Sequence, residues 1–251
     1  MTTATTAVPT RREPELLGQT VVVIGGSAGI GLATARRARA EGASVILTGR
    51  NPERLRQAAL ALDAQRSAAF DANDPAALQS FFRNLPAPID HVMVTAGAPH
   101  YGPLLEMPLE EARRLLTERL SLALAVAHGA TGKVRPAGSL VFMSGTGARS
   151  RAGVGIVSIV AAALPALIAS LAIELAPIRV NLIAAGFVDT PLSASLLGDE
   201  LDNHLDELRA TLPIRRVVGP ADVAALAVHL MSNTALTGAT YDIDGGQQLV
   251  S

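Results

Sequence analysis

Residues 20–31 read Thr-Val-Val-Val-Ile-Gly-Gly-Ser-Ala-Gly-Ile-Gly, a short apolar run followed by closely spaced glycines. The run Thr20 to Ile24 predicts a buried strand, and the segment Ile30 to Glu41 predicts a helix directly after the glycines. Glycines at such a turn let the backbone bend tightly and approach a phosphate group. The amides and dipole of the helix N-terminus then stabilise the phosphate charge. One glycine-rich turn is weakly specific, so its meaning depends on the rest of the chain.

Short β-branched runs alternate with longer helical segments along nearly the whole sequence. The predicted strands are Thr20 to Ile24, Val45 to Thr48, Ala68 to Asp71, His91 to Ala96, Ser139 to Met143, Val180 to Ala184 and Thr240 to Ile243. The predicted helices are Ile30 to Glu41, Pro52 to Asp63, Pro75 to Leu85, Glu110 to His128, Val154 to Ala176 and Pro220 to Met231. Most strands are continuously apolar, as expected where helices cover both faces. The pattern predicts an α/β fold, a Rossmann-type doubly wound sheet of seven parallel strands flanked by helices in a single domain.

The composition excludes several classes of function. Of the 251 residues, 49% are apolar and 17% are charged, which is enough apolar material for one large core. The net charge is −1 and the arginines are scattered, so nucleic acid is not an expected partner. The absence of cysteine excludes disulfides, thiolate zinc sites and a thiol nucleophile. The five histidines lack metal-ligand spacing, so no metal is expected.

Three segments bear on location and organisation. Residues 1–15 predict a flexible tail before a domain over 16–251, because Met1 to Pro14 has no apolar signal core, and a cytoplasmic location is expected. Ala152 to Ile173 is uncharged and long enough to cross a bilayer. Glycines and Pro165 interrupt it, so we favour a helix buried between the sheet and a partner subunit, with no membrane contact. Residues 186–212 form a long connection, which predicts a lid over the substrate.

Further motifs follow the glycine pattern G-G-x-x-x-G-x-G in order along the chain. They are Phe70-Asp71, Thr95-Ala96-Gly97, Leu171 to Ala176, Ile178 to Asn181, Ala185 to Thr190, Leu236 to Gly238 and Asp244 to Gly246. Together these motifs resemble the short-chain dehydrogenase/reductase family from about Leu16 to the C-terminus. The resemblance implies a bound dinucleotide, with Asp71 at the adenine and Thr190 at the nicotinamide amide. The implied cofactor-binding residues are Gly25, Ser27, Ala28, Gly29, Ile30, Gly31, Arg50, Asn51, Asp71, Ala72, Ala96, Gly97, Gly186, Val188 and Thr190.

The end of the second strand predicts which dinucleotide binds. An acidic residue there would bind the ribose hydroxyls of NAD and repel a 2′-phosphate, but this sequence has Gly49 followed by Arg50. A guanidinium suits a phosphate, so NADP(H) is the expected cofactor. The alternative is a surface arginine that merely starts a helix.

The family resemblance also identifies what is missing. In that family a Tyr transfers the proton, a Lys four residues later lowers the pKa of the Tyr, and a strand-end Ser holds the substrate oxygen. Ser144 matches the serine, whereas Val157 and Ala161 occupy the Tyr and Lys positions. No shift of alignment restores the pair, because the only tyrosines are Tyr101 and Tyr241 and the only lysine is Lys133.

Few side chains are candidates to replace the lost groups. Arg119 or a neighbour stands at the position of the asparagine that completes the family's proton relay. His100 and Tyr101 follow the fourth strand and are either substitute acids or residues of a solvated loop. Arg149 and Arg151 either hold an acidic substrate or face water. Asp189 either titrates near the nicotinamide or caps a helix.

Three functions are consistent with these residues. The first is an NADP(H)-dependent oxidoreductase of divergent mechanism that acts on a small carbonyl or enone substrate. The second is a catalytically silent NADP(H) sensor or supporting subunit, and the third is a non-redox isomerase or cyclase. The helices Glu110 to His128 and Val154 to Ala176 are more apolar than one sheet face requires, so a homodimer or homotetramer is expected.

Overall fold

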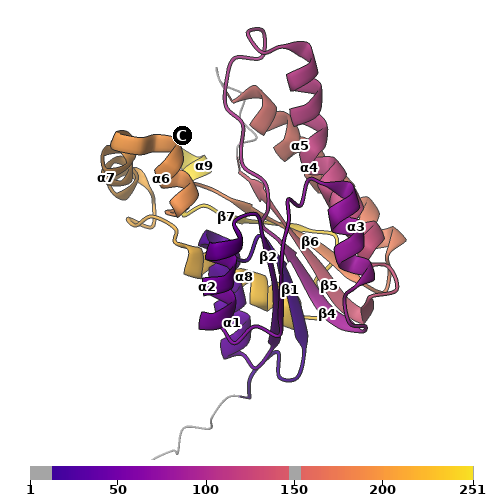
Figure 1. Ribbon diagram of the computed structural model, residues 1–251. Helices are drawn as coiled ribbons and strands as arrows, with labels where there is room; N and C mark the ends of the chain where they lie inside the picture. Colours follow the sequence, from indigo (N-terminus) through magenta and orange to yellow (C-terminus); the bar gives the residue numbers. More distant parts are fainter. Residues whose placement is uncertain (1–12, 147–153, 251) are drawn as a thin grey trace, which may run out of the picture.

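The computed structural model describes residues 13–146 and 154–250; most of the predicted tail and the segment with Arg149 and Arg151 lie outside the described residues. A seven-stranded sheet forms the centre of the molecule (Figure 1). Its strands are β1 (Thr20–Ile24), β2 (Ser44–Gly49), β3 (Arg66–Ala69), β4 (Ile89–Val94), β5 (Val134–Gly145), β6 (Arg179–Ala185) and β7 (Thr240–Ile243). All neighbours pair in parallel in the order β3-β2-β1-β4-β5-β6-β7, which confirms the predicted doubly wound sheet.

Helices cover both faces of this sheet. They are α1 (Gly29–Ala40), α2 (Pro52–Ala61), α3 (Pro75–Arg83), α4 (Leu109–Ala130), α5 (Gly155–Glu174), α6 (Pro191–Leu197), η1 (Gly198–Glu200), α7 (Leu201–Thr211), α8 (Pro220–Ser232) and α9 (Gln247–Val250). One core cluster joins the sheet to α3, α4 and α5, and the other joins it to α1, α2 and α8 (Figure 1). Because β1 and β4 are neighbours, the chain reverses its winding direction between them, and ligands of such sheets bind at that point.

The third strand corrects the sequence prediction. The prediction placed it at Ala68 to Asp71, whereas β3 pairs with β2 from Ile46↔Arg66 to Gly49↔Ala69. As the edge strand it is largely exposed and begins with polar residues, so it lacks the apolar run that marks the other strands. Phe70 and Asp71 therefore lie in the turn after the strand rather than at its end.

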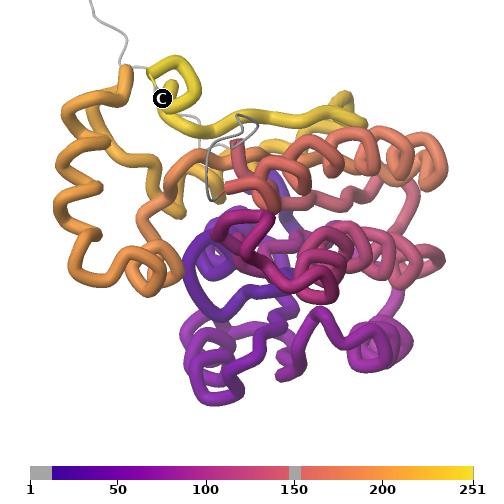
Figure 2. The backbone as a smooth tube through the Cα atoms, turned by 90° about the horizontal axis from the view of Figure 1, so that it is seen from above, coloured from indigo at the N-terminus to yellow at the C-terminus, as the bar shows by residue number. Residues whose placement is uncertain are grey.

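The long connection predicted between residues 186 and 212 has secondary structure of its own. It contains α6, η1 and α7, which lie to one side of the sheet and next to the C-terminal segment (Figure 2). An isolated bridge from Val188 to Val218 and a hydrogen bond from Ser193 Oγ to the Val188 carbonyl (3.0 Å) anchor its start. These contacts hold the connection beside the carboxyl ends of β6 and β7.

Helix α5 passes the length and composition test for a membrane span, as the sequence already indicated. Its Ile156, Leu164 and Ile168 lie in the core between α4 and the sheet. The opposite face leaves Ile159 and Ile173 exposed. A core helix of this kind passes the same test, so the helix is weak support for a membrane location.

Candidate functional site

The glycine loop closes tightly against the end of β4. Gly25 has φ +96°, and a Cβ on it would lie 2.8 Å from the Ala96 amide nitrogen. A Cβ on Gly31 would lie 2.2 Å from the Gly25 carbonyl oxygen, so neither position accepts a side chain. Thr95 Oγ1 donates to the same carbonyl at 3.1 Å. The glycine loop, which follows β1, is therefore packed against the end of the neighbouring strand β4.

The N-terminus of α1 is built to receive an anion. Its N-cap residue, Ala28, makes no side-chain cap hydrogen bond, and the first turn contains no acidic residue. The first amides of the helix and its positive dipole end therefore remain available for a negative group. A Cβ on Gly29 (φ +51°) would approach only Thr190 and Pro191, at 3.6 and 4.0 Å. These features fit the pyrophosphate of a dinucleotide, whose charge this helix end would stabilise.

The predicted adenine side differs in detail from the sequence expectation. Gly49 is buried, and a Cβ there would lie 2.8 Å from Ser27 Oγ. Arg50 is exposed and has no ion pair or hydrogen bond with the described side chains. Asn51 Oδ1 accepts the Arg54 amide at 2.8 Å, so this side chain caps α2.

Asp71 and Ala72 complete this side from the turn after β3. The Asp71 carboxylate accepts the Asn73 amide at 3.0 Å and is otherwise exposed, while Ala72 is buried in the core. The turn therefore places a solvated carboxylate at the carboxyl end of the edge strand.

The opposite wall is formed where β6 meets the C-terminal segment. A Cβ on Gly186 would lie 2.6 Å from both Asp244 Cβ and Gln247 Oε1, so glycine is required for this packing. Gln247 Oε1 accepts the Phe187 amide at 2.8 Å. Burial raises the pKa of Asp244, but hydrogen bonds from the Gln248 and Gly246 amides outweigh it and lower the pKa overall.

Thr190 starts α6 with a reciprocal capping interaction. Its hydroxyl accepts the Ser193 amide at 3.2 Å, and Ser193 Oγ accepts the Thr190 amide at 2.8 Å. The backbone amide of Asp189 donates a hydrogen bond to the Val218 carbonyl at 3.2 Å. Thr190, and not Asp189, is therefore the cap of α6.

The predicted catalytic positions lie at the end of β5 and at the start of α5. Ser144 is half-buried at the carboxyl end of β5, opposite Ala184, and its hydroxyl has only the Gly145 carbonyl at 3.5 Å as a partner among the described residues. Val157 is half-buried in the first turn of α5, and Ala161 is buried one turn later. Neither side chain can donate or accept a proton.

The loop after β4 carries both predicted substitute acids. His100 is half-buried, whereas Tyr101 is 57% exposed. The same loop packs on the start of α5, because a Cβ on Gly155 would lie 2.6 Å from Leu104 Cγ. Ser158 on α5, which sequence reasoning did not identify, has a buried hydroxyl with no hydrogen-bond partner among the described residues.

Arg119 is the side chain whose role sequence reasoning missed. Its Nη1 donates to the Ala96 carbonyl at 2.7 Å, and a Cβ on Gly97 would lie 2.8 Å from the same nitrogen. Burial lowers the pKa of the guanidinium, and the neighbouring Glu118 carboxylate partly opposes this. A spacing of 23 residues between Arg119 and Ala96 left no local pattern from which the contact could be inferred.

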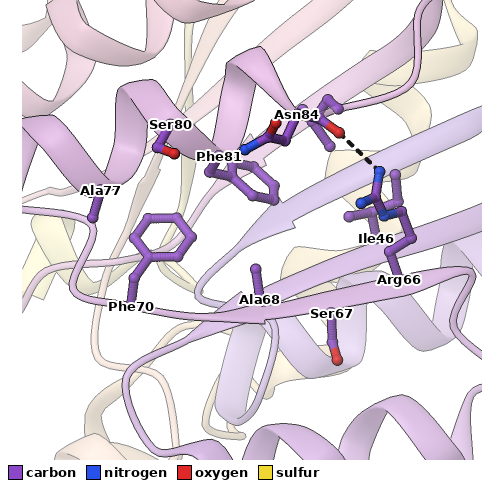
Figure 3. A pocket seen from close by; sticks show the side chains of 10 residues that line it. Ile46, Arg66, Ser67, Ala68, Phe70, Ala77, Ser80, Phe81 and Asn84 are labelled. Atoms are coloured by element: carbon purple, nitrogen blue, oxygen red, sulfur yellow. Dashed lines mark hydrogen bonds between the residues drawn. The ribbon is translucent and has the colours of Figure 1, made fainter.

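Other parts of the described chain offer little competing chemistry. Residues 13–146 and 154–250 contain no group of three or more His, Asp or Glu side chains able to hold a metal ion. A cavity of about 400 Å³ lies between β3 and α3 (Figure 3). Phe70 and Phe81 face each other in it, with ring centroids 5.3 Å apart, and no carboxylate or imidazole lines it. The cavity therefore lacks acid–base groups.

Comparisons with known proteins agree with this arrangement. The family model for enoyl-(acyl carrier protein) reductase matches residues 25–248. The short-chain dehydrogenase/reductase malC from Malbranchea aurantiaca is 30% identical over 96% of this chain and 99% of its own length.

Two solved structures extend the comparison. The MalC reductase/Diels-Alderase from Malbranchea aurantiaca superimposes with a TM-score of 0.88 at 28% identity, covering 95% of this chain and all of that one. The L-sorbose reductase from Gluconobacter frateurii, solved with NADPH and L-sorbose, gives a TM-score of 0.83 at 26% identity over 94% and 98% of the two chains. The sequence resemblance is thereby confirmed along nearly the full length. The chain belongs to the short-chain dehydrogenase/reductase family, whose members compared here are oxidoreductases.

Proposed function

We propose that this protein is an NADP(H)-dependent oxidoreductase that acts on a small carbonyl or enone substrate without the family's Tyr and Lys. The observation that carries the proposal is the open N-terminus of α1, which lacks both a side-chain cap and an acidic first turn. A chain with no anionic ligand would gain stability from an acidic or capping residue there. The retained glycine loop supports the same conclusion.

Different residues of the chain would bind the different parts of the cofactor and the substrate. The glycine loop and the first amides of α1 would bind the pyrophosphate, and Arg50 would bind the 2′-phosphate as a free guanidinium. When bound, the nicotinamide supplies or accepts a hydride. Ser144 would hold a substrate oxygen, since its hydroxyl has only the Gly145 carbonyl, at 3.5 Å, as a partner among the described residues.

The aliphatic pair at Val157 and Ala161 limits the proton chemistry. Loss of a positioned general acid costs about two to four orders of magnitude in rate. An enone suits this site better than a ketone, because its final proton goes to carbon and can come from water. His100 and Tyr101 are the side chains that could provide a proton otherwise.

Cofactor choice is tested by titrating NADPH and NADH into the protein in a calorimeter. We expect NADPH to bind at least about tenfold more tightly, and Arg50→Met to remove most of that difference, because a charged hydrogen bond to phosphate is lost. Arg83→Met, an exposed arginine on α3 that pairs with Gln79, is the matched control. Absence of binding by both dinucleotides would contradict the proposed function.

Turnover is tested by stopped-flow loss of NADPH absorbance against a panel of carbonyl and enone substrates. Oxidation of NADPH with any member supports the oxidoreductase. Binding without oxidation on the whole panel supports the silent sensor or supporting subunit instead. A ring-closing activity without net redox is a further candidate, favoured by the similarity to the MalC reductase/Diels-Alderase and by the aliphatic Val157 and Ala161.

A further inference from the structure

We infer that Arg119 takes over the cofactor-holding part of the missing lysine's role: its guanidinium, fixed beneath the Ala96–Gly97 turn, donates hydrogen bonds to the ribose on the nicotinamide side of the bound dinucleotide. The inference rests on the proposed function, because it requires that a dinucleotide binds. It assigns the cation to α4, whereas the family's lysine would stand on α5.

The position of Arg119 on α4 is unusual for an arginine. Leu115, Leu122 and Val126 of the same helix are buried, and Arg119 lies between them at the spacing of one helix face. A charged side chain in such a stripe loses hydration, which is why its pKa is lowered. Retaining an arginine in this stripe is costly unless the guanidinium has a partner there.

Contacts with the described residues use only a small part of the hydrogen-bonding capacity of the Arg119 guanidinium. An arginine carries five N–H donors, and the described residues offer Arg119 one acceptor, the Ala96 carbonyl. Arg179, which is buried whereas Arg119 is half-buried, differs in this respect. Both terminal nitrogens of Arg179 donate to backbone carbonyls, those of Leu230, Met231, Asn233 and Leu236, so this guanidinium caps the end of α8. Arg119 keeps most of its donors for a ligand.

The location of those donors identifies the ligand group. The Ala96–Gly97 turn follows β4 and packs against Gly25 of the glycine loop. Because Arg119 binds this turn, its guanidinium lies close to the predicted pyrophosphate site. The adenine half extends from there toward β2 and Arg50, and the other half extends over β4 toward Ser144. The first polar groups along that half are ribose hydroxyls, which accept hydrogen bonds from a guanidinium.

Helix packing explains how one helix can substitute for the other. α4 and α5 pack on each other in the same core cluster, with Leu122 on one and Leu164 on the other. Ala161 on α5 is buried and carries no charge. The cation needed near the ribose is therefore provided by the neighbouring helix.

The test compares two ligands of one protein. Binding of NADPH and of adenosine 2′,5′-bisphosphate, which has the adenine half only, is measured by calorimetry for the unchanged protein and for Arg119→Met. We expect the variant to lose about tenfold or more in NADPH affinity and to bind the bisphosphate as before. Arg113→Met, on the exposed face of α4 where it pairs with Glu110, is the control and should change neither.

The possible results separate the two proposals. Equal weakening of both ligands, or no weakening of NADPH, overturns the role of Arg119. Failure of the unchanged protein to bind either ligand overturns the proposed function instead. A misfolded Arg119→Met protein would be replaced by Arg119→Lys, which keeps the charge but loses the planar fork and should weaken NADPH alone by a smaller factor.

A rescue experiment tests the substitution of one cation for another. Adding Ala161→Lys to Arg119→Met restores the family's lysine, and we expect NADPH affinity to recover toward that of the unchanged protein. The same lysine added while Arg119 is present should give no comparable gain. An equal gain in both backgrounds would show that the two positions act independently, which overturns the inference.

Discussion

At the scale of single residues, Val157 and Ala161 determine which chemistry this site can perform. Both are aliphatic residues of α5, and the sequence resemblance predicts that they occupy the positions of the family's proton donor and its lysine. The proposed function retains the glycine loop and Ser144. We expect such a site to regain activity when the Tyr and the Lys are both returned.

We therefore predict that Val157→Tyr with Ala161→Lys raises the rate of ketone reduction by NADPH about a hundredfold, the lower end of the range for general acid catalysis. The measurement is steady-state loss of NADPH absorbance. Val157→Phe with Ala161→Lys supplies the same ring without the hydroxyl and should give no such gain. Equal rates for the two double variants would show that the rest of the site is not arranged for this proton transfer.

His91 illustrates a residue whose chemistry serves stability. Its ring is buried at the amino edge of the sheet, with Nδ1 2.8 Å from Ser139 Oγ and Nε2 2.6 Å from Gln19 Oε1. The amide oxygen can only accept, so Nε2 carries the proton and Nδ1 accepts from the serine. Burial, and then the charges of Arg179 and Arg135, lower the pKa of His91 to about 3.

This shift has a definite sign for stability. The unfolded chain binds a proton at His91 near pH 6.5 and the folded chain only near pH 3, so the free energy of unfolding falls as the pH drops through that window, by up to about 1.4 kcal/mol per unit. Denaturant unfolding at several pH values measures the slope. His91→Gln should flatten it, while His128→Gln, at an exposed position on α4, should leave it unchanged. Parallel slopes for the unchanged protein and His91→Gln would contradict the prediction.

At the scale of elements, the start of α1 has a backbone conformation that favours glycine and is also the predicted site of the pyrophosphate. Gly29 and Gly132 both have positive φ, +51° and +71°, and both have room for a Cβ. Gly132 lies in the turn between α4 and β5, at the other edge of the sheet. The two positions therefore form a matched pair.

Each glycine-to-alanine change should lower the free energy of unfolding by about 1 kcal/mol, because an L-residue is disfavoured at positive φ. Gly29→Ala should in addition weaken NADPH binding, since the new methyl group faces Thr190 across the predicted pyrophosphate site. Thermal unfolding and calorimetric titration give the two quantities. An unaltered NADPH affinity in Gly29→Ala would place the pyrophosphate elsewhere.

At the scale of the whole molecule, the two long helices expose more apolar surface than a monomer needs. Ile159 and Ile173 on α5 are 46% and 80% exposed, and Leu124 on α4 is 42% exposed. We expect exposed apolar surface of this kind to be buried against another copy of the chain in a symmetric dimer or tetramer.

We predict a homodimer or homotetramer that dissociates when Ile159→Glu is combined with Ile173→Glu. The reason is that two carboxylates would lose hydration in the interface. Light scattering coupled to size-exclusion chromatography gives the mass. Leu60→Glu on α2, where the side chain is 69% exposed, is the control and should keep the oligomer. A monomeric unchanged protein would contradict the prediction.

Most helix starts and the alternation of strands and helices were predictable because their causes are local. Pro52, Pro75 and Pro220 mark the beginnings of α2, α3 and α8 as the sequence predicted, since a proline at the first helical position depends only on its neighbours. The glycine loop and the missing Tyr and Lys could also be read directly. The edge strand β3 was misplaced by two residues because it lacks the buried apolar run.

The sequence by itself determined the doubly wound sheet, and it predicts the phosphate-binding loop and the loss of the family's Tyr and Lys, because periodicity, glycine spacing and residue type act over a few neighbouring positions. Only the tertiary structure decided that Gln19 fixes the tautomer of His91 from 72 positions away, and that Arg119 lies beneath Ala96. Those contacts depend on how helices pack on the sheet, and packing brings together side chains that no local pattern relates.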